Sequence, residues 1–255
     1  MKNGASRGCI AWHELWTTEP DAAIAFYTRT IGWSVDPASE TPDPRLKASD
    51  RPIGAIVTLA GARERHAPHW LTYLGCGDVD ATCRQAETLG GAVVVPPCMF
   101  SAVGRRAVLQ DPQGALFGIA TQAAGTEGKA RVTTPGEFSW HELATTDCED
   151  AFRFYGSLFG WEHTGQFDLG AAGMYYLCGH RGLSFGGVCS VGSATSAPAW
   201  LPYIHVDDVR IAADRMGAYG GSVAVPVHEV PGGEWVVVGT DPQGARFAAH
   251  QLKPR

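Results

Sequence analysis

The chain lacks the segments that mark membrane proteins and nucleic-acid-binding proteins. None of its 255 residues belongs to an apolar run of the roughly 18 residues that a membrane span requires. Its 20 lysine and arginine residues are scattered, and its net charge is −6, so we expect neither nucleic acid nor an anionic membrane as a partner. The segment before Ile10 lacks the apolar core of a secretion signal, and we expect a cytoplasmic protein.

Several common site motifs are also missing. The 7 cysteines form no Cys-x-x-Cys pair, and most stand among apolar neighbours, which indicates reduced, buried thiols rather than disulfides or a zinc site. No Gly-x-Gly-x-x-Gly segment follows a strand-like run, and there is neither a Walker loop nor a Gly-x-Ser-x-Gly elbow.

What the chain does have is an internal duplication. Trp-His-Glu-Leu at 12–15 returns at 140–143, and Asp-Pro-Gln-Gly-Ala at 111–115 returns at 241–245. Phe-Tyr and Gly-Trp pairs return in the same order between them. A domain-sized period indicates two copies of one domain. The small, polar segment 123–135 has the composition of a linker, so we place the domains at 8–122 and 136–252.

Each domain divides again into two modules. Thr18 and Thr146 stand where a residue would cap the first helix of each domain, and Asp78 and Asp208 open the second helices. Strand-like runs surround these helices, and Asp-Pro-Gln-Gly fits a type I turn before the last strand. The pattern predicts an α+β fold in which a strand–helix–three-strand (βαβββ) unit occurs four times.

These motifs together resemble the vicinal oxygen chelate (VOC) superfamily, the group of glyoxalases, bleomycin-resistance proteins and extradiol dioxygenases. The resemblance covers nearly the whole chain. It implies two tandem domains, each a pair of βαβββ modules whose strands curl into a cupped sheet. It also implies a small ligand in the cup, often held on a divalent metal. Family metal ligands lie seven residues before the acid that opens a helix and seven residues after the Asp of Asp-Pro-x-Gly.

The residues at those positions cannot hold a metal. None offers an imidazole, a carboxylate or a thiolate, and they are Trp12, Leu71, Gly118, Trp140, Leu201 and Ala248. We therefore expect no metal or other cofactor and do not expect extradiol dioxygenase chemistry.

Alternation along the strands selects other candidates. If positions 12 and 140 face the cup, Glu14 and Glu142 do so too, while His13 and His141 face the helices as core residues. The two carboxylates could orient a ligand or act as a base. Alternatively, they could bond a backbone group or an arginine such as Arg106 or Arg246 and hold the sheet together.

The second cup has the more polar lining. Tyr203, His205 and His250 share its inward face, where the first copy has Tyr73, Gly75 and Ala120. They could form a ligand-orienting cluster, a displaced metal site or scattered rim residues. The second copy also has a strand-forming segment at 167–177, where the first has a proline-rich segment at 35–45 that predicts a loop or a frayed edge. The candidate catalytic residues are Glu142, His205 and His250, and the candidate ligand-binding residues are Trp12, Glu14, Tyr73, Trp140, Glu142, Tyr203, His205 and His250.

Three hypotheses follow for function. The first is a metal-free protein that binds a small, partly apolar molecule with a polar head. The second is a glyoxalase-type lyase, isomerase or hydrolase that uses a non-standard metal site or Glu142 with a histidine as general base. The third is a pseudo-enzyme that acts in assembly or regulation. A monomer suffices for any of these, and a homodimer is the alternative.

Overall fold

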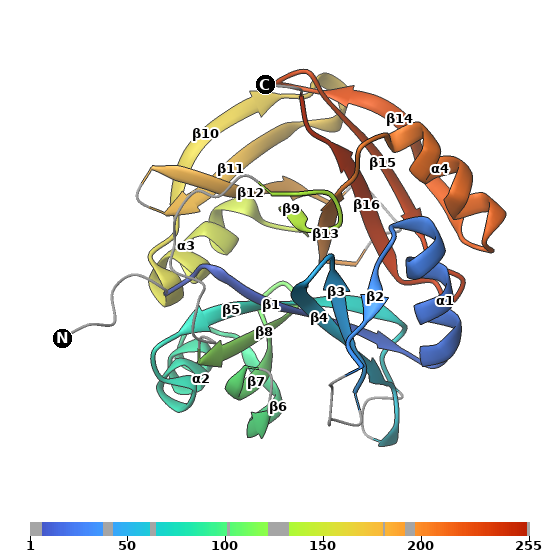
Figure 1. Cartoon of the computed structure of the whole chain (residues 1–255). Helices are drawn as coiled ribbons and strands as arrows, with labels where there is room; N and C mark the ends of the chain where they lie inside the picture. Colours follow the sequence, from blue (N-terminus) through green and yellow to red (C-terminus); the bar gives the residue numbers. More distant parts are fainter. Residues whose placement is uncertain are drawn as a thin grey trace. The chain divides into compact units, whose positions relative to one another are not determined.

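The computed structural model describes residues 7–37, 43–61, 65–100, 103–121, 133–180, 182–191 and 197–253. The predicted βαβββ unit occurs four times (Figure 1). The first module contains β1 (Ile10–Thr17), α1 (Pro20–Thr30), β2 (Ser34–Val35), β3 (Arg45–Ala48) and β4 (Arg51–Thr58). The second contains β5 (His69–Cys76), α2 (Val79–Thr88), β6 (Ala92–Phe100), β7 (Gly104–Gln110) and β8 (Leu116–Thr121).

The third and fourth modules repeat this order. The third contains β9 (Phe138–Thr145), α3 (Cys148–Phe159), β10 (Glu162–Asp168), the single turn η2 (Gly170–Ala172), β11 (Met174–His180) and β12 (Leu183–Ser190). The fourth contains β13 (Ala199–His205), α4 (Val209–Ala218), β14 (Ser222–Val230), β15 (Glu234–Thr240) and β16 (Arg246–Gln251). No helix among the described residues is long and apolar enough to cross a membrane.

The strands form two eight-stranded mixed sheets with the same order. The first runs β2-β3-β4-β1-β5-β8-β7-β6, and the second runs β10-β11-β12-β9-β13-β16-β15-β14. The edge strands differ as predicted, because β2 has 2 residues whereas β10 has 7 and pairs with β11 along its length. Part of the proline-rich segment, residues 38–42, lies outside the described residues.

Aspartates cap three of the four helices. Asp78, Asp147 and Asp208 each accept a hydrogen bond from a backbone N–H in the first turn. The prediction that Thr18 and Thr146 cap α1 and α3 was wrong, because each helix begins one residue later than that prediction requires. α1 starts at Pro20 after Glu19, whose side chain makes no capping bond.

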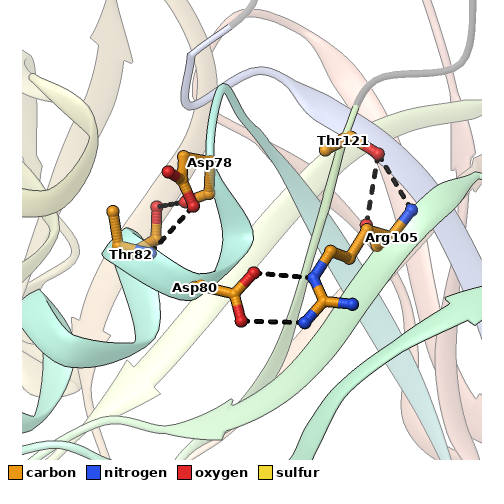
Figure 2. Close-up of polar contacts among 6 residues, drawn as sticks. Asp78, Asp80, Thr82, Arg105 and Thr121 are labelled. Carbon is orange, nitrogen blue, oxygen red and sulfur yellow. Dashed lines mark hydrogen bonds and ion pairs between the residues drawn. The ribbon is translucent and has the colours of Figure 1, made fainter.

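The start of α2 is also tied to β7 (Figure 2). The guanidinium of Arg105 donates two hydrogen bonds to the carboxylate of Asp80, at 2.6 and 2.8 Å. The Thr121 hydroxyl on β8 accepts from the Arg105 backbone N–H at 3.0 Å. Both partners of the ion pair are well exposed, so the pair adds little to stability.

The chain forms two compact units, and each unit takes segments from both halves. One contains residues 1–12, 71–131 and 141–200, and the other contains residues 13–70, 132–140 and 201–255. In the first unit, α2 and α3 share one apolar core with β7 and β8. In the second, α1 and α4 share a core with β15 and β16. The domain boundaries predicted at the linker, most of which lies outside the described residues, remain a prediction.

The repeated motifs join the halves inside each unit. The Tyr155 hydroxyl donates to Asp111 at 3.0 Å in one unit, and the Tyr27 hydroxyl donates to Asp241 at 3.3 Å in the other. The other oxygen of Asp111 accepts backbone N–H groups of its own Asp-Pro-Gln-Gly turn. The predicted core role of the Phe-Tyr pairs is confirmed, since all four rings are buried.

Candidate functional site

The strands of the fourth module carry two separate sets of apolar side chains. Ile204, Val237 and Phe247 pack with α4 in the core of their unit. Tyr203, Val236, Val238 and Ala248 form a second cluster with the half-buried Trp140, Leu201 and Val230. The predicted alternation is therefore confirmed here. We call the side of these strands that bears the second cluster, together with His250, the inner face of the second domain.

A hydrogen-bonded chain of three side chains lies at this inner face. His250 Nε2 lies 2.9 Å from Glu234 Oε2, and His250 Nδ1 lies 3.0 Å from the Ser139 hydroxyl. The Tyr203 ring packs edge-on against the imidazole, with 6.0 Å between the ring centroids. The imidazole is 6% exposed and the Glu234 side chain is 35% exposed, so Glu234 forms the solvent end of the chain.

Burial keeps this imidazole neutral. Burial lowers the pKa of His250 below its ordinary value. The Glu234 carboxylate raises this pKa and the nearby His205 lowers it, but burial is the largest effect. A neutral imidazole has one N–H donor and one bare nitrogen. An ionised carboxylate can only accept, so the proton sits on Nε2 facing Glu234 and Nδ1 is left as an acceptor facing Ser139.

His205 is next to His250 in the sheet but has different partners. The two residues pair across β13 and β16. His205 Nδ1 lies 3.0 Å from the Thr133 carbonyl oxygen. The residue also lines a cavity of about 170 Å³ with Gly136, Asp208 and Arg215. The structure therefore brings Tyr203 and His250 together, while the His205 ring is directed toward Thr133.

Glu142 belongs to the other compact unit. There it pairs with Gly187 across β9 and β12, and it accepts a hydrogen bond from the Cys189 thiol. Burial, together with the charge of the Glu142 carboxylate, raises the pKa of Cys189 to about 12, so this thiol stays protonated. The grouping of Glu142 with Tyr203, His205 and His250 remains a prediction.

The matching face of the first domain is filled by its own side chains. A β-carbon placed on Gly118 would lie 2.2 Å from the Tyr73 ring, so that ring occupies the space of any side chain at this position. Arg106 stacks on Phe100, 3.7 Å from the ring centroid, and donates to the Tyr73 hydroxyl at 3.4 Å. Burial lowers the pKa of Arg106 to about 10.

Glu14 has an indole partner. Its carboxylate is fully buried and accepts from Trp16 Nε1 at 3.0 Å, which places both side chains on one face of β1 as predicted. Trp16 in turn contacts His69, with 5.3 Å between ring centroids. The contact with Trp16 supports the interpretation that Glu14 has a structural role.

The side chains at the six positions where the family holds its metal cannot coordinate a metal ion in this chain. The side chains present are indole, aliphatic or absent, and at Gly118 the Tyr73 ring leaves no room for a ligand side chain. Within the described parts of the chain, no group of three or more His, Cys, Asp or Glu residues could hold a metal ion.

The two domains differ in how far matched positions are exposed. Trp12, Glu14, Leu71 and Gly75 are all buried in the first domain. Their counterparts in the second domain are all half-buried, and they are Trp140, Glu142, Leu201 and His205. At these four positions the residues of the second domain are therefore more exposed than their counterparts in the first. That the second domain has the better-formed pocket remains a prediction.

Sequence reasoning missed two members of the network. Glu234 follows the glycine pair of a turn, but two-residue alternation from Val236 and Val238 would have placed it on the inner face. Strict alternation places Ser139 opposite Trp140, so no pattern pointed to it.

Residues predicted to be structural behave as such. His13 and His141 are buried, with only 5% and 4% of their surface exposed. The His13 ring stacks on Phe138, with the ring centroids 3.6 Å apart. All seven cysteines are free thiols. The prediction that they are buried holds for Cys76, Cys83 and Cys178. It was wrong for Cys98, which is exposed, and the remaining three are half-buried.

Known proteins resemble the chain in sequence and in fold. The model described as "Glyoxalase/Bleomycin resistance protein/Dioxygenase superfamily" matches residues 137–249, and the "Glyoxalase-like domain" model matches residues 12–120. "Putative glyoxylase CFP32" of Mycobacterium tuberculosis is 32% identical over 97% of this chain and 95% of its own length. "Anthracycline biosynthesis protein DauV" of Streptomyces sp. (strain C5) is 27% identical over 96% of this chain and 94% of its own length.

Solved structures agree on the fold. The Mn(II)-bound glyoxalase from Novosphingobium aromaticivorans superposes with a TM-score of 0.66 at 17% identity, covering 96% of this chain and 83% of its own. The 2,3-dioxygenase LapB from Pseudomonas sp. KL28 gives a TM-score of 0.67 at 11% identity, with 98% and 94% covered. The duplicated modules, the two matching sheets and the relatives together show that this chain belongs to the glyoxalase/bleomycin resistance/dioxygenase (VOC) superfamily, with two glyoxalase-like domains in tandem.

Proposed function

We propose that the protein binds a small organic molecule on the inner face of the second domain without a metal ion. The polar head of the ligand would bond the Ser139–His250–Glu234 chain, and its apolar part would lie on Tyr203 and on the half-buried Trp140 and Leu201. The observation that carries this proposal is a buried imidazole bonded on both sides, next to apolar side chains that remain partly exposed. Such a mixture of apolar wall and few polar groups is typical of small-molecule sites.

The names of the relatives suggest the first compounds to try. One relative is named for glyoxylase activity and another for anthracycline biosynthesis. Probes would therefore include glyoxylase-type substrates and an anthracycline, together with small aromatic carboxylic acids and ketones that match the polar head and apolar wall.

A lyase or isomerase activity of glyoxalase type is the second candidate. It is favoured by the bare Nδ1 of a neutral His250, because a general base must be unprotonated at the working pH. Glu142 and His205 stay candidates for the same role.

The test is a thermal-shift screen of the full chain in buffer containing EDTA. A ligand at about 100 times its Kd should add about 2.7 kcal/mol to the free energy of unfolding. His250→Gln should remove most of that shift, whereas His228→Gln, at an exposed histidine of β14, should leave it intact. A ligand that stabilises only after a divalent metal is added, or equally well in H250Q, would contradict the proposal.

A further inference from the structure

The three groups of the His250 network have the order of an activated nucleophile. A hydroxyl (Ser139), an imidazole (His250) and a carboxylate (Glu234) follow one another at 3.0 and 2.9 Å. A nucleophile within hydrogen-bond reach of a base, with the base held by a third group, is the signature of covalent catalysis by serine.

The proton positions suit that chemistry. With Nε2–H donated to Glu234, the Ser139 hydroxyl finds the bare Nδ1 at 3.0 Å, closer than its other acceptor, the Tyr203 carbonyl oxygen at 3.3 Å. The base is therefore Nδ1, and Glu234 fixes the tautomer that makes it one. The roles of the two ring nitrogens are exchanged relative to the well-known serine protease triad, but the order of the groups is the same.

The duplication supplies an internal comparison. The counterparts of Ser139, His250 and Glu234 in the first copy are Ala11, Ala120 and Gly104. The strand registers of the two copies match at this point. Arg106 pairs with Ala120 across β7 and β8, and the equivalent Val236 pairs with His250 across β15 and β16. The first copy builds the same sheet with none of the three polar groups, so the fold does not need them. All three occur together in one domain.

The surroundings favour a small apolar substituent on the reacting group. Ser139 is partly exposed, and it precedes Trp140 of the half-buried apolar set. Tyr203 and Leu201 belong to the same cluster. An acyl or alkyl group attached to the attacked centre could lie on these side chains.

We propose that Ser139 is a base-activated nucleophile for small activated acyl or phosphonyl compounds that carry an apolar group. Ser139 Oγ forms a bond to the carbonyl carbon, its proton passes to His250 Nδ1, and the departing alkoxide takes that proton. Water then cleaves the acyl–serine ester by the reverse proton path and regenerates the hydroxyl. The inference shares His250 with the proposed function but does not require the same ligand.

The test uses a small alkyl fluorophosphonate on the full chain. Attack by Ser139 forms a phosphorus–oxygen bond and releases fluoride, so the intact mass rises by one phosphonyl group, and peptide mapping of the wild-type protein locates it. We expect a single adduct on Ser139. Ser139→Ala should abolish it, and His250→Gln should slow it by about a hundredfold or more. Glu234→Gln should slow it by about tenfold or more because the tautomer is no longer held.

The matched control is Ser184→Ala. Ser184 is an exposed serine whose hydroxyl bonds Thr164 at 2.8 Å, and its replacement should leave the labelling rate unchanged. Absence of an adduct in the wild-type protein, an adduct on another residue, or an unchanged rate in a folded H250Q would overturn the inference. Retention of the ligand-induced thermal shift in the same wild-type sample would then show that only the nucleophile, and not ligand binding, had failed.

Discussion

At the scale of single residues, each compact unit has a buried hydrogen bond between a tyrosine of one half of the chain and an aspartate of the other. Tyr155 donates to Asp111 at 3.0 Å and accepts from Trp200 Nε1 at 3.2 Å. Tyr27 makes the same two bonds with Asp241 and Trp70. Because buried polar groups must be paired, these hydroxyls explain why both copies keep the Phe-Tyr and Asp-Pro-Gln-Gly motifs.

We expect Tyr155→Phe to destabilise the protein by about 2 kcal/mol. The change leaves a buried carboxylate oxygen and a buried indole N–H without this partner, at a cost of about 1–3 kcal/mol. Urea unfolding at pH 7 measures the effect. Tyr219→Phe, at a residue that is 40% exposed, is the control and should stay within a few tenths of a kcal/mol of wild type. Equal stability of the two variants would show that the crossed bond contributes nothing.

His141 should make stability fall in mild acid. Burial lowers its pKa from 6.5 to about 4. Below pH 6.5 the unfolded chain takes up a proton that the folded chain refuses until about pH 4, so this residue removes up to about 3 kcal/mol of stability across that window. Denaturant unfolding at several pH values should show a shallower acid loss in His141→Gln than in wild type. The exposed His163→Gln should follow the wild-type curve, and an unchanged slope in H141Q would refute the assignment.

Sequence reasoning at this scale was best where alternation is strict. It placed Tyr203 and His250 on the inward face of their strands. It placed His13 and His141 on the opposite face of their own strands, as core residues. It failed for Ser139, whose contact with His250 departs from the alternation of β9. It also missed the Cys189 partner of Glu142, because a strand's side-chain pattern does not reveal which neighbouring strand will supply the contact.

At the scale of helices and strands, all four modules followed from the sequence, but the helix starts did not. Aspartate in an extended conformation caps three helices, and the expected threonines do not. Capping residues are read from short patterns, so an error of one residue changes the assigned cap. The contrast between β2 and β10 was predictable because proline disrupts a strand regardless of its tertiary contacts.

The capping geometry predicts unequal effects of two similar substitutions. Asp78 accepts from the Ala81 N–H at 2.9 Å, so Asp78→Ala should cost about 1 kcal/mol. Glu19 makes no side-chain capping bond, and Glu19→Ala should cost no more than a few tenths of a kcal/mol. Thermal unfolding of the two variants tests this directly. A larger loss in E19A than in D78A would show that the first helix is capped differently.

At the scale of the whole molecule, the halves of the sequence are not the compact units of the fold. Each unit joins one module of the first half to one module of the second. The Trp161 indole donates to the Gly8 carbonyl oxygen in one unit, and the Trp33 indole donates to the Gly136 carbonyl oxygen in the other. A repeat in the sequence identifies the modules but does not show which of them share a core, since that choice depends on contacts far apart in the chain.

Cutting the chain between the halves should therefore leave it assembled. A protease site inserted in segment 123–135 would yield two fragments that elute together from a sizing column, because both apolar cores contain side chains from each half. The uncut protein with the same insertion is the control. Separation of the fragments into two folded species would contradict the shared cores.

The central claim is that this VOC protein binds its ligand on the inner face of the second domain without a coordinated metal. The most direct measurement is the metal content of the full chain after incubation with manganese, zinc, iron or nickel and removal of the excess. We predict well below one ion per chain for each metal, with any ligand-induced stabilisation unaffected by EDTA. One firmly held ion per chain, whose removal also abolishes ligand binding, would contradict the account.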